Sequence, residues 1–171
     1  NGMLVDTDDG EDVKLKDVHV LKSMFNNFHV RGAGSVSFVS CTAKGSVHGR
    51  GFDAGGSVTI SADSCTSSGN RRHGFGVTDS ASVTMKKSLL SGNMQTGLGL
   101  WKNATAEVTR SRICDNGIEG LYAASDYAGT FENCRIENNK RNGANLQERT
   151  NIIMNGCDIT GNANSGLLAY G

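Results

Sequence analysis

A repeat with a period of 23 residues constrains this chain more than any other feature of its sequence. Glycine recurs at Gly51, Gly74, Gly97, Gly120, Gly143 and Gly166, and asparagine at Asn70, Asn93, Asn116, Asn139 and Asn162. A third column of small side chains consists of Cys65, Ser88, Ser111, Cys134 and Cys157. A fixed period of roughly 20 to 50 residues indicates a repeat architecture, in which each repeat stacks on its neighbours.

Apolar residues follow the same period and alternate with polar residues inside each repeat. Their columns are Met85, Val108, Phe131 and Met154; Leu90, Ile113, Ile136 and Ile159; Phe52, Phe75, Leu98, Leu121, Ala144 and Leu167; and Ala54, Val77, Leu100, Ala123, Leu146 and Ala169. This alternation indicates strands with one buried face, and the apolar spacing of a helix is not sustained anywhere. We therefore expect coils of short strands and turns, which bury their apolar faces by stacking.

The asparagine and glycine columns are interpreted as structural rather than catalytic. Paired strands lie about 4.8 Å apart, so the stacked asparagines are expected to form a ladder of amides from coil to coil. We place this ladder at a tight turn, because asparagine tolerates the left-handed backbone that such a turn requires. The glycine column indicates either a turn with positive φ or a close approach of two backbones.

The combined pattern resembles that of a known fold. The order apolar-x-x-Cys/Ser-x-apolar-x-x-Asn-x-x-x-Gly-apolar-x-apolar occurs over residues 108–123, 131–146 and 154–169. It is similar to the parallel β-helix repeat of the pectate-lyase-like superfamily. The resemblance implies an all-β fold, a right-handed parallel β-helix solenoid of about seven coils of 23 residues. That superfamily contains polysaccharide lyases, hydrolases and epimerases, viral tailspikes, and modules that bind sugars or proteins, so the resemblance implies a fold rather than one activity.

The repeat covers nearly the whole chain, so we expect a single domain over residues 1–171. Both ends lie within a repeat and carry no obvious polar cap, at residues 1–5 and 165–171. Solenoids protect their ends with caps. We therefore expect a segment of a longer solenoid, or ends that are covered by the rest of a longer chain or by oligomerisation.

The composition argues against several classes of partner. The 17 basic and 17 acidic residues cancel, so no long-range field attracts the chain to nucleic acid or to an anionic membrane. No apolar run approaches the roughly 18 residues that cross a bilayer. We therefore expect a carbohydrate or protein partner, with no nucleic acid and no membrane.

The five cysteines are expected to be free thiols. The inward column of small residues contains Cys65, Cys134 and Cys157, and Cys41 precedes Cys65 by one position more than the period. Parallel side chains on neighbouring coils suit disulfide torsions poorly, and Cys114 lies outside this column. Because no histidines lie at zinc spacing, we expect no metal and no other cofactor. Free thiols favour a reducing, intracellular compartment, whereas the sequon at residues 103–105 favours secretion.

One face carries the candidate ligand-binding residues. The outward positions of the strand after each repeat glycine include Trp101, Tyr122, Asn145, Gln147 and Tyr170, and Arg141 lies in the flanking turn. Aromatic rings stack on the C–H faces of sugars and amides bind hydroxyl groups, so this set predicts a binding face. Two alternatives stay open: aromatic residues suit strands in general, or the face packs on another part of the parent protein. On the opposite rim, Asp126 and Arg149 are expected to form an ion pair.

The sequence contains weaker evidence for catalysis. The resemblance implies clustered aspartates for a hydrolase, a carboxylate calcium site for a lyase and a D-P-H motif for an epimerase. The chain has no proline, and we expect no Asp or Glu at the outward positions of the aromatic strand set. The acidic segment 6–12 is expected to be a connecting loop without EF-hand spacing. His73 and Glu119, in the flanking turns, are the candidate acid and base.

The sequence therefore predicts a non-catalytic interaction module that presents a rigid sheet face to a carbohydrate or protein partner. Part of a polysaccharide lyase, hydrolase or epimerase is the alternative, and a structural spacer is the second alternative. Whether the chain is an enzyme stays open at this point.

Overall fold

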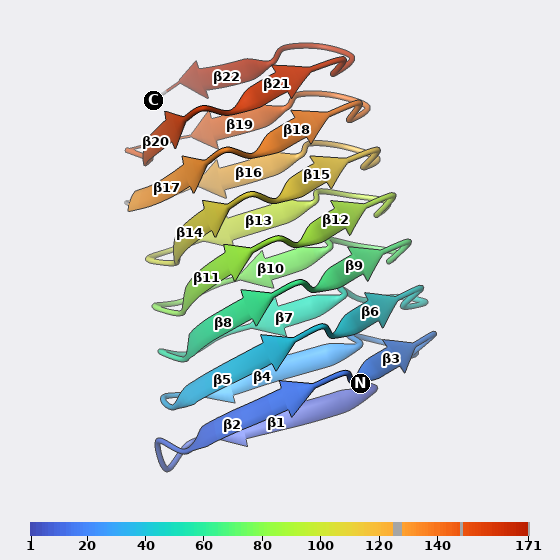
Figure 1. Ribbon diagram of the computed structural model, residues 1–171, viewed down its shortest axis with the longest axis vertical. Helices are drawn as coiled ribbons and strands as arrows, with labels where there is room; N and C mark the ends of the chain where they lie inside the picture. The colour runs from blue at the N-terminus through green and yellow to red at the C-terminus, as the bar shows by residue number, and fades with distance from the viewer. Residues whose placement is uncertain (125–127, 148, 171) are drawn as a thin grey trace.

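A computed structural model of the chain describes residues 1–124, 128–147 and 149–170. The chain winds into a stack of coils, and each coil contributes one short strand to each of three sheets (Figure 1). Neighbouring strands within a sheet are three apart in chain order, and the pairs are parallel. None of the described residues forms a helix long and apolar enough to cross a membrane. The predicted all-β parallel solenoid is confirmed.

The strands of the three sheets are as follows. Sheet A has the order β1 (Met3–Thr7), β4 (Phe28–Gly32), β7 (Phe52–Ala54), β10 (Phe75–Val77), β13 (Leu98–Trp101), β16 (Leu121–Ala124), β19 (Ala144–Gln147) and β22 (Leu167–Tyr170). Sheet B has the order β2 (Asp12–Lys16), β5 (Ser35–Val39), β8 (Thr59–Asp63), β11 (Ser82–Lys86), β14 (Thr105–Thr109), β17 (Ala128–Glu132) and β20 (Asn151–Asn155). Sheet C contains β3 (His19–Leu21), β6 (Thr42–Lys44), β9 (Thr66–Ser68), β12 (Leu89–Ser91), β15 (Arg112–Cys114), β18 (Arg135–Glu137) and β21 (Asp158–Thr160).

The register of sheet A is constant over most of the chain and changes near the N-terminus. Phe52 pairs with Phe75 and Phe75 with Leu98, and each of these steps equals the period of the repeat. Phe28 pairs with Phe52, a step that is longer than the period by one position, and Met3 pairs with Phe28, a step that is longer by two. The apolar residues of β4 and β7 keep their inward positions, so the turns absorb the additional residues.

The predicted apolar columns form the core. Phe28, Phe52 and Phe75 are buried and stacked, with ring centroids 4.8 and 5.0 Å apart. Phe38 from sheet B packs edge-on against this stack, at 5.2 Å from Phe28 and 5.1 Å from Phe52. The strand spacing of about 4.8 Å places like rings at stacking distance, so the repeat itself produces the packing.

The asparagine column forms the predicted ladder. The Nδ2 atom of Asn93 donates to Oδ1 of Asn116 at 3.0 Å, and Asn116 donates to Asn139 in the same way at 3.0 Å. From Asn93 onward, each Oδ1 atom also accepts from the backbone N–H of the asparagine in the preceding coil, as Asn116 does from Asn93. The predicted left-handed backbone of these asparagines is wrong, because positive φ occurs at the residue before each of them. These residues are Gly69, Gly92, Asp115, Asn138 and Gly161.

The glycine column is explained by a close approach of backbones. A Cβ atom on Gly97 would lie 2.8 Å from Nδ2 of Asn116 and 2.8 Å from the carbonyl oxygen of Gly120. Gly97 has no positive φ. Of the two alternatives, the structure therefore supports contact between coils, because the amide ladder occupies the space that a side chain would need.

The cysteines are free thiols, as predicted. The buried Cys134 donates through Sγ to the carbonyl oxygens of Val108 and Glu132, both at 3.3 Å. Ser88 occupies the same column and donates through Oγ to the carbonyl oxygen of Lys86 at 2.9 Å. The column therefore requires a small side chain that can donate to a carbonyl, which both residue types provide.

Candidate functional site

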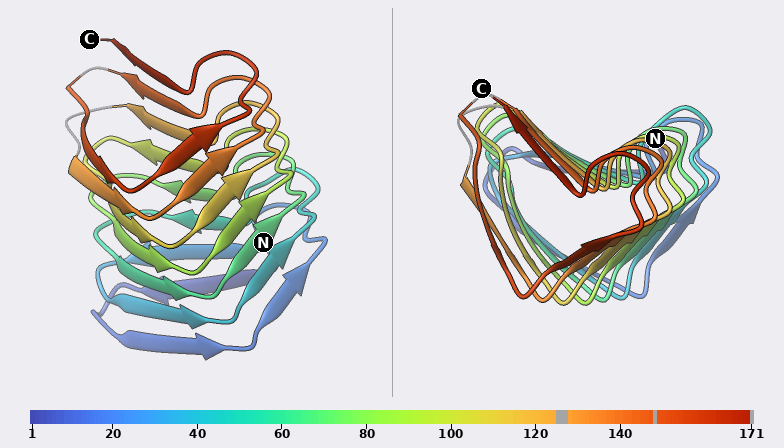
Figure 2. Two further views of the ribbon diagram at one scale, coloured as in Figure 1. Left: turned by 45° about the horizontal axis from the view of Figure 1, so that its top comes forward. Right: turned by 90° about the horizontal axis from the view of Figure 1, so that it is seen from above.

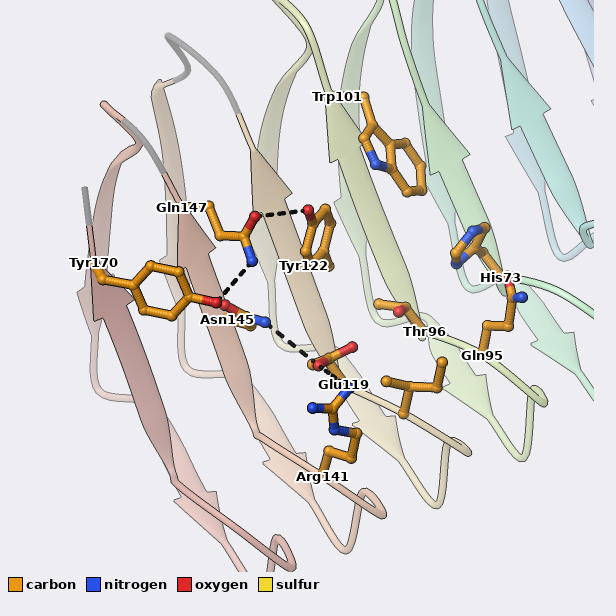
Figure 3. Close-up of a pocket in the computed structure, with 11 residues that line it drawn as sticks. His73, Gln95, Thr96, Trp101, Glu119, Tyr122, Arg141, Asn145, Gln147 and Tyr170 are labelled. Atoms are coloured by element: carbon orange, nitrogen blue, oxygen red, sulfur yellow. Dashed lines mark hydrogen bonds and ion pairs between the residues drawn. The ribbon is translucent and has the colours of Figure 1, made fainter.

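A groove runs along one side of the solenoid, between sheet A and the turns that precede its strands. Viewed from above, the coils are indented on this side (Figure 2). The lateral groove has a volume of about 410 Å³. It is lined by His73, Gln95, Thr96, Trp101, Ile118, Glu119, Tyr122, Arg141, Asn145, Gln147 and Tyr170 (Figure 3). The structure thus brings together all the predicted ligand-binding residues and the two predicted acid–base candidates.

The strand register explains why these side chains meet. Tyr122 on β16 pairs with Asn145 on β19, and Gln147 on β19 pairs with Tyr170 on β22. Positions paired in a parallel sheet project from the same face. The constant period of the repeat therefore places the aromatic and amide side chains in rows that follow the groove.

Hydrogen bonds hold the aromatic row in place. The hydroxyl group of Tyr122 donates to Oε1 of Gln147 at 2.9 Å, and Nε2 of Gln147 donates to the hydroxyl oxygen of Tyr170 at 2.9 Å (Figure 3). One amide therefore links two tyrosines from coils on either side of it. Because both ends of that amide are bonded, the orientation of the two phenol groups is coupled.

Trp101 and Arg50 lie across sheet A because two of its outward positions, Gly99 on β13 and Gly76 on β10, are glycine. A Cβ atom on Gly99 would collide with the indole, and one on Gly76 would lie 2.7 Å from Cδ of Arg50. The guanidinium carbon of Arg50 lies 4.9 Å from the indole centroid, over the ring. The rings of His73 and Tyr122 lie at 4.8 and 6.0 Å. The indole is therefore held among polar neighbours.

The floor of the groove carries buried polar atoms. Glu119 and Asn145 are only 4% and 7% exposed. Nδ2 of Asn145 donates to Oε1 of Glu119 at 3.4 Å, and Nη1 of Arg141 lies 3.9 Å from the same oxygen. Within the described part of the chain, Oδ1 of Asn145 and Nδ1 of His73 are buried without a hydrogen-bond partner. Buried polar atoms are rarely left without partners, so this floor is suited to receive a ligand or water.

His73 is a neutral side chain in this environment. Burial lowers the pKa of its imidazole to about 4, and the positive charges of Arg50 and Arg72 contribute to the shift. At neutral pH the ring therefore offers one donor and one acceptor rather than a positive charge. Among the described residues, no hydrogen bond or ion pair joins His73 to Glu119, its predicted partner in acid–base chemistry.

A polar cluster at the N-terminal part of sheet A was missed by the sequence reasoning. Asp53 on β7 is an outward residue of the same sheet, as is Asp6 on β1, so the expected absence of acidic residues there is wrong. Segment 6–12 is likewise not entirely a loop, because its first residue lies in β1 and its last in β2. The sequence contained a signal for this cluster, because His29 and Asp53 each lie between two apolar residues, in Phe28-His29-Val30 and Phe52-Asp53-Ala54. The two segments are not one period apart, so the period did not align them.

Asp53 is bonded by three side chains. Its Oδ2 atom accepts from Nδ1 of His29 at 2.8 Å and from Nδ2 of Asn26 at 2.7 Å, and its Oδ1 atom accepts from Nη1 of Arg50. A carboxylate only accepts, so the proton of a neutral His29 lies on Nδ1 and the Nε2 atom is left as the basic nitrogen. Arg50 then links this cluster to Trp101.

One expected interaction cannot be placed. The predicted ion pair between Asp126 and Arg149 includes a residue that lies outside the described part of the chain.

Stacked parallel coils with an open lateral groove define a class of proteins, the parallel β-helices. The chain belongs to the right-handed β-helix family, whose pattern matches residues 5–171. Comparison with curated proteins and with solved structures finds no match. Family membership establishes a right-handed β-helix that serves as a structural scaffold, and the function must be inferred from the groove.

Proposed function

We propose that the chain is a non-catalytic module that binds a carbohydrate in the lateral groove. The observation that carries this proposal is the combination of a floor with unpartnered buried polar atoms and a row of aromatic rings beside it. Hydroxyl groups of a sugar donate and accept, so they can satisfy Oδ1 of Asn145 and Nδ1 of His73. The aromatic rings supply apolar faces for the C–H groups of the same sugar.

The geometry of the solenoid supports an extended ligand. Neighbouring coils are separated by about 4.8 Å, which is close to the length of one pyranose residue in a chain. Successive sugars could therefore meet successive coils, from Trp101 on β13 to Tyr170 on β22. The lining residues are spread over these four strands, which suits a polymer or oligomer rather than a compact molecule.

A glycan-array screen with the purified chain tests the proposal. We expect binding to at least one polysaccharide, and a loss of at least tenfold in affinity for Trp101→Ala, since a buried aromatic contact contributes roughly 1.4 kcal/mol or more. Glu107→Ala on β14 is the matched control, because Glu107 is exposed on sheet B, away from the groove. Absence of glycan binding, or equal loss in both variants, would contradict the proposal.

One observation favours a second function, catalysis on a bound polysaccharide. His29 is oriented by Asp53, and its side chain is 29% exposed, so Nε2 could act as a general base. A two-carboxylate hydrolase mechanism fits poorly, because Asp53 and Glu119 belong to coils three steps apart, about 14 Å, whereas such pairs lie roughly 5 to 10 Å apart.

Product analysis distinguishes the two functions. Each glycan that binds is incubated with the chain and examined for new ends or altered sugars by mass spectrometry. Under the catalytic alternative, product forms and His29→Asn abolishes it without weakening binding. Under the binding proposal, the glycan is recovered unchanged.

A further inference from the structure

The carboxylate of Glu119 is buried but poorly satisfied. It is 4% exposed and lies in the turn before β16, on the floor of the lateral groove. A carboxylate can accept about four hydrogen bonds, yet Oε1 receives one long bond of 3.4 Å, from Asn145. Among the described residues, no hydrogen bond to Oε2 is found. This carboxylate therefore lacks a close donor. A buried charge without partners is costly.

Arg141 does not supply that donor. Its Nη1 atom lies 3.9 Å from Oε1, beyond hydrogen-bond distance, and its side chain is 60% exposed on the rim of the groove. At this distance, and with Arg141 exposed to solvent, the ion pair contributes little. Because the side chain of Arg141 is exposed, it can move aside, and a cation that reaches hydrogen-bond distance can replace it at Oε1.

A second acceptor lies beside Glu119. Nδ2 of Asn145 is directed toward Glu119, so Oδ1 of the same amide is left buried and without a partner in the described part of the chain. Asn145 as a whole is only 7% exposed. A carboxylate with one long donor contact and an amide oxygen with none favour a group that only donates.

Aromatic rings complete the surroundings. Tyr122 pairs with Asn145 in the sheet register, and Trp101 lies 6.0 Å from Tyr122 between ring centroids. Both rings line the groove with Glu119, and aromatic faces attract cations. His73, which also lines the groove, is uncharged at neutral pH because its pKa is lowered to about 4, so it does not repel one.

We propose that the groove floor binds the protonated amino group of an amino sugar, with Glu119 as its counter-ion and Oδ1 of Asn145 as its second acceptor. An ammonium group carries three donors and no acceptor, which matches a poorly satisfied carboxylate beside an unpartnered amide oxygen. The inference rests on the proposed carbohydrate-binding function and names the class of sugar that the same groove selects.

The amino-sugar inference is tested by calorimetric titration with two matched ligands. These are a tetrasaccharide of glucosamine and its N-acetylated counterpart. We expect the tetrasaccharide with free amines to bind at least about tenfold more tightly, because only this ligand can form a charge-assisted hydrogen bond with Glu119. Glu119→Gln keeps the shape but removes the charge, and it should abolish the preference while both ligands still bind weakly. Thermal melting of this variant verifies that it is folded.

A second variant strengthens the test by predicting a gain. Arg141→Ala removes the competing cation from an exposed position, so the variant should bind the glucosamine tetrasaccharide more tightly. Its affinity for the N-acetylated tetrasaccharide should be unchanged or lower. No gain in this variant would contradict the assignment of Glu119 as counter-ion.

The remaining outcomes separate the two proposals. Equal affinity for both tetrasaccharides, lost in Trp101→Ala, would overturn the amino-sugar inference and leave carbohydrate binding intact. Absence of binding to either ligand, together with a negative glycan array, would overturn both. Tighter binding of a lysine peptide than of the glucosamine tetrasaccharide, lost in Glu119→Gln, would replace the sugar by a protein partner.

Discussion

The environment of His73 shows how one residue acquires its properties from several coils. The side chain belongs to the turn before β10, but Trp101 from β13 packs against its ring at 4.8 Å. Burial lowers its pKa to about 4, with Arg50 and Arg72 as additional causes. The ring is thus neutral in the folded chain over a pH range in which an exposed histidine becomes charged.

This shift predicts a loss of stability in mild acid. Between pH 6.5 and pH 4 the unfolded chain binds a proton at His73 that the folded chain does not, so stability falls as the pH falls through this window. The full shift corresponds to about 3 kcal/mol. We expect urea denaturation at pH 7 and pH 4 to show this loss, and His73→Gln to reduce it. An unchanged loss in that variant would show that other groups are responsible.

The turn between sheets C and A is the element that organises both the stack and the groove. It contains a left-handed residue, the ladder asparagine and the repeat glycine, as in Gly92, Asn93 and Gly97. The left-handed residue turns the chain so that the next side chain points inward to the ladder. The glycine then allows the following coil to approach. The groove residues His73 and Glu119 lie immediately before such glycines.

Two glycines of this turn should respond differently to alanine. In Gly97→Ala the new Cβ would lie 2.8 Å from a backbone carbonyl and from a ladder amide, so we expect a loss of about 3 kcal/mol. In Gly92→Ala nothing lies within 4 Å, but φ is +61°, and the loss should be about 1 kcal/mol. Chemical denaturation measures both. Equal losses would indicate that conformation, not contact, governs the glycine column.

The ladder itself predicts a large effect of a single amide. Asn93→Ala removes the acceptor of the buried backbone N–H of Asn70 and one of the three acceptors of its Nδ2 atom, so we expect a loss of about 2 kcal/mol. Asn155→Ala, an exposed position on β20, is the control and should change the free energy of unfolding by less than about 0.5 kcal/mol. Similar melting curves for the two variants would argue against a stabilising ladder.

At the scale of the whole molecule, the solenoid is a rigid support for one long groove. Each coil packs chiefly on its neighbours, and each adds a row of outward side chains to sheet A. Trp101, Tyr122, Gln147 and Tyr170 lie on four successive strands of this sheet. A ligand that follows the axis therefore meets four coils, one after another.

This arrangement predicts that affinity depends on ligand length. For an oligosaccharide that binds in the groove, affinity should rise from two to about four sugar units and then level off, because about 4.8 Å of groove is available per coil. Calorimetry over a length series measures the dependence. A maximum already at one or two units would indicate a compact pocket instead of an extended groove.

The period of the sequence was sufficient to predict the strands, the buried columns, the amide ladder and the outward row from Trp101 to Tyr170. Each of these depends only on alternation within a strand and a constant step between coils. The cluster of His29 and Asp53 was not predicted, because the first coils are longer than the period and the register shifts there. A period-based alignment does not follow such additions within turns.

The sequence by itself therefore determined the fold and the face on which a site could lie. In a repeat stacked at one strand spacing, alternation along each strand decides whether a side chain points to the core or to the outside. The tertiary structure alone decided which outward atoms meet. Glycines at positions 76 and 99 let Arg50 and Trp101 lie across the sheet. The carboxylate of Glu119 contacts Nδ2 of Asn145, and Oδ1 of that amide is left without a donor in the described part of the chain. These contacts depend on side-chain conformation and on the approach of different coils, which periodicity does not encode.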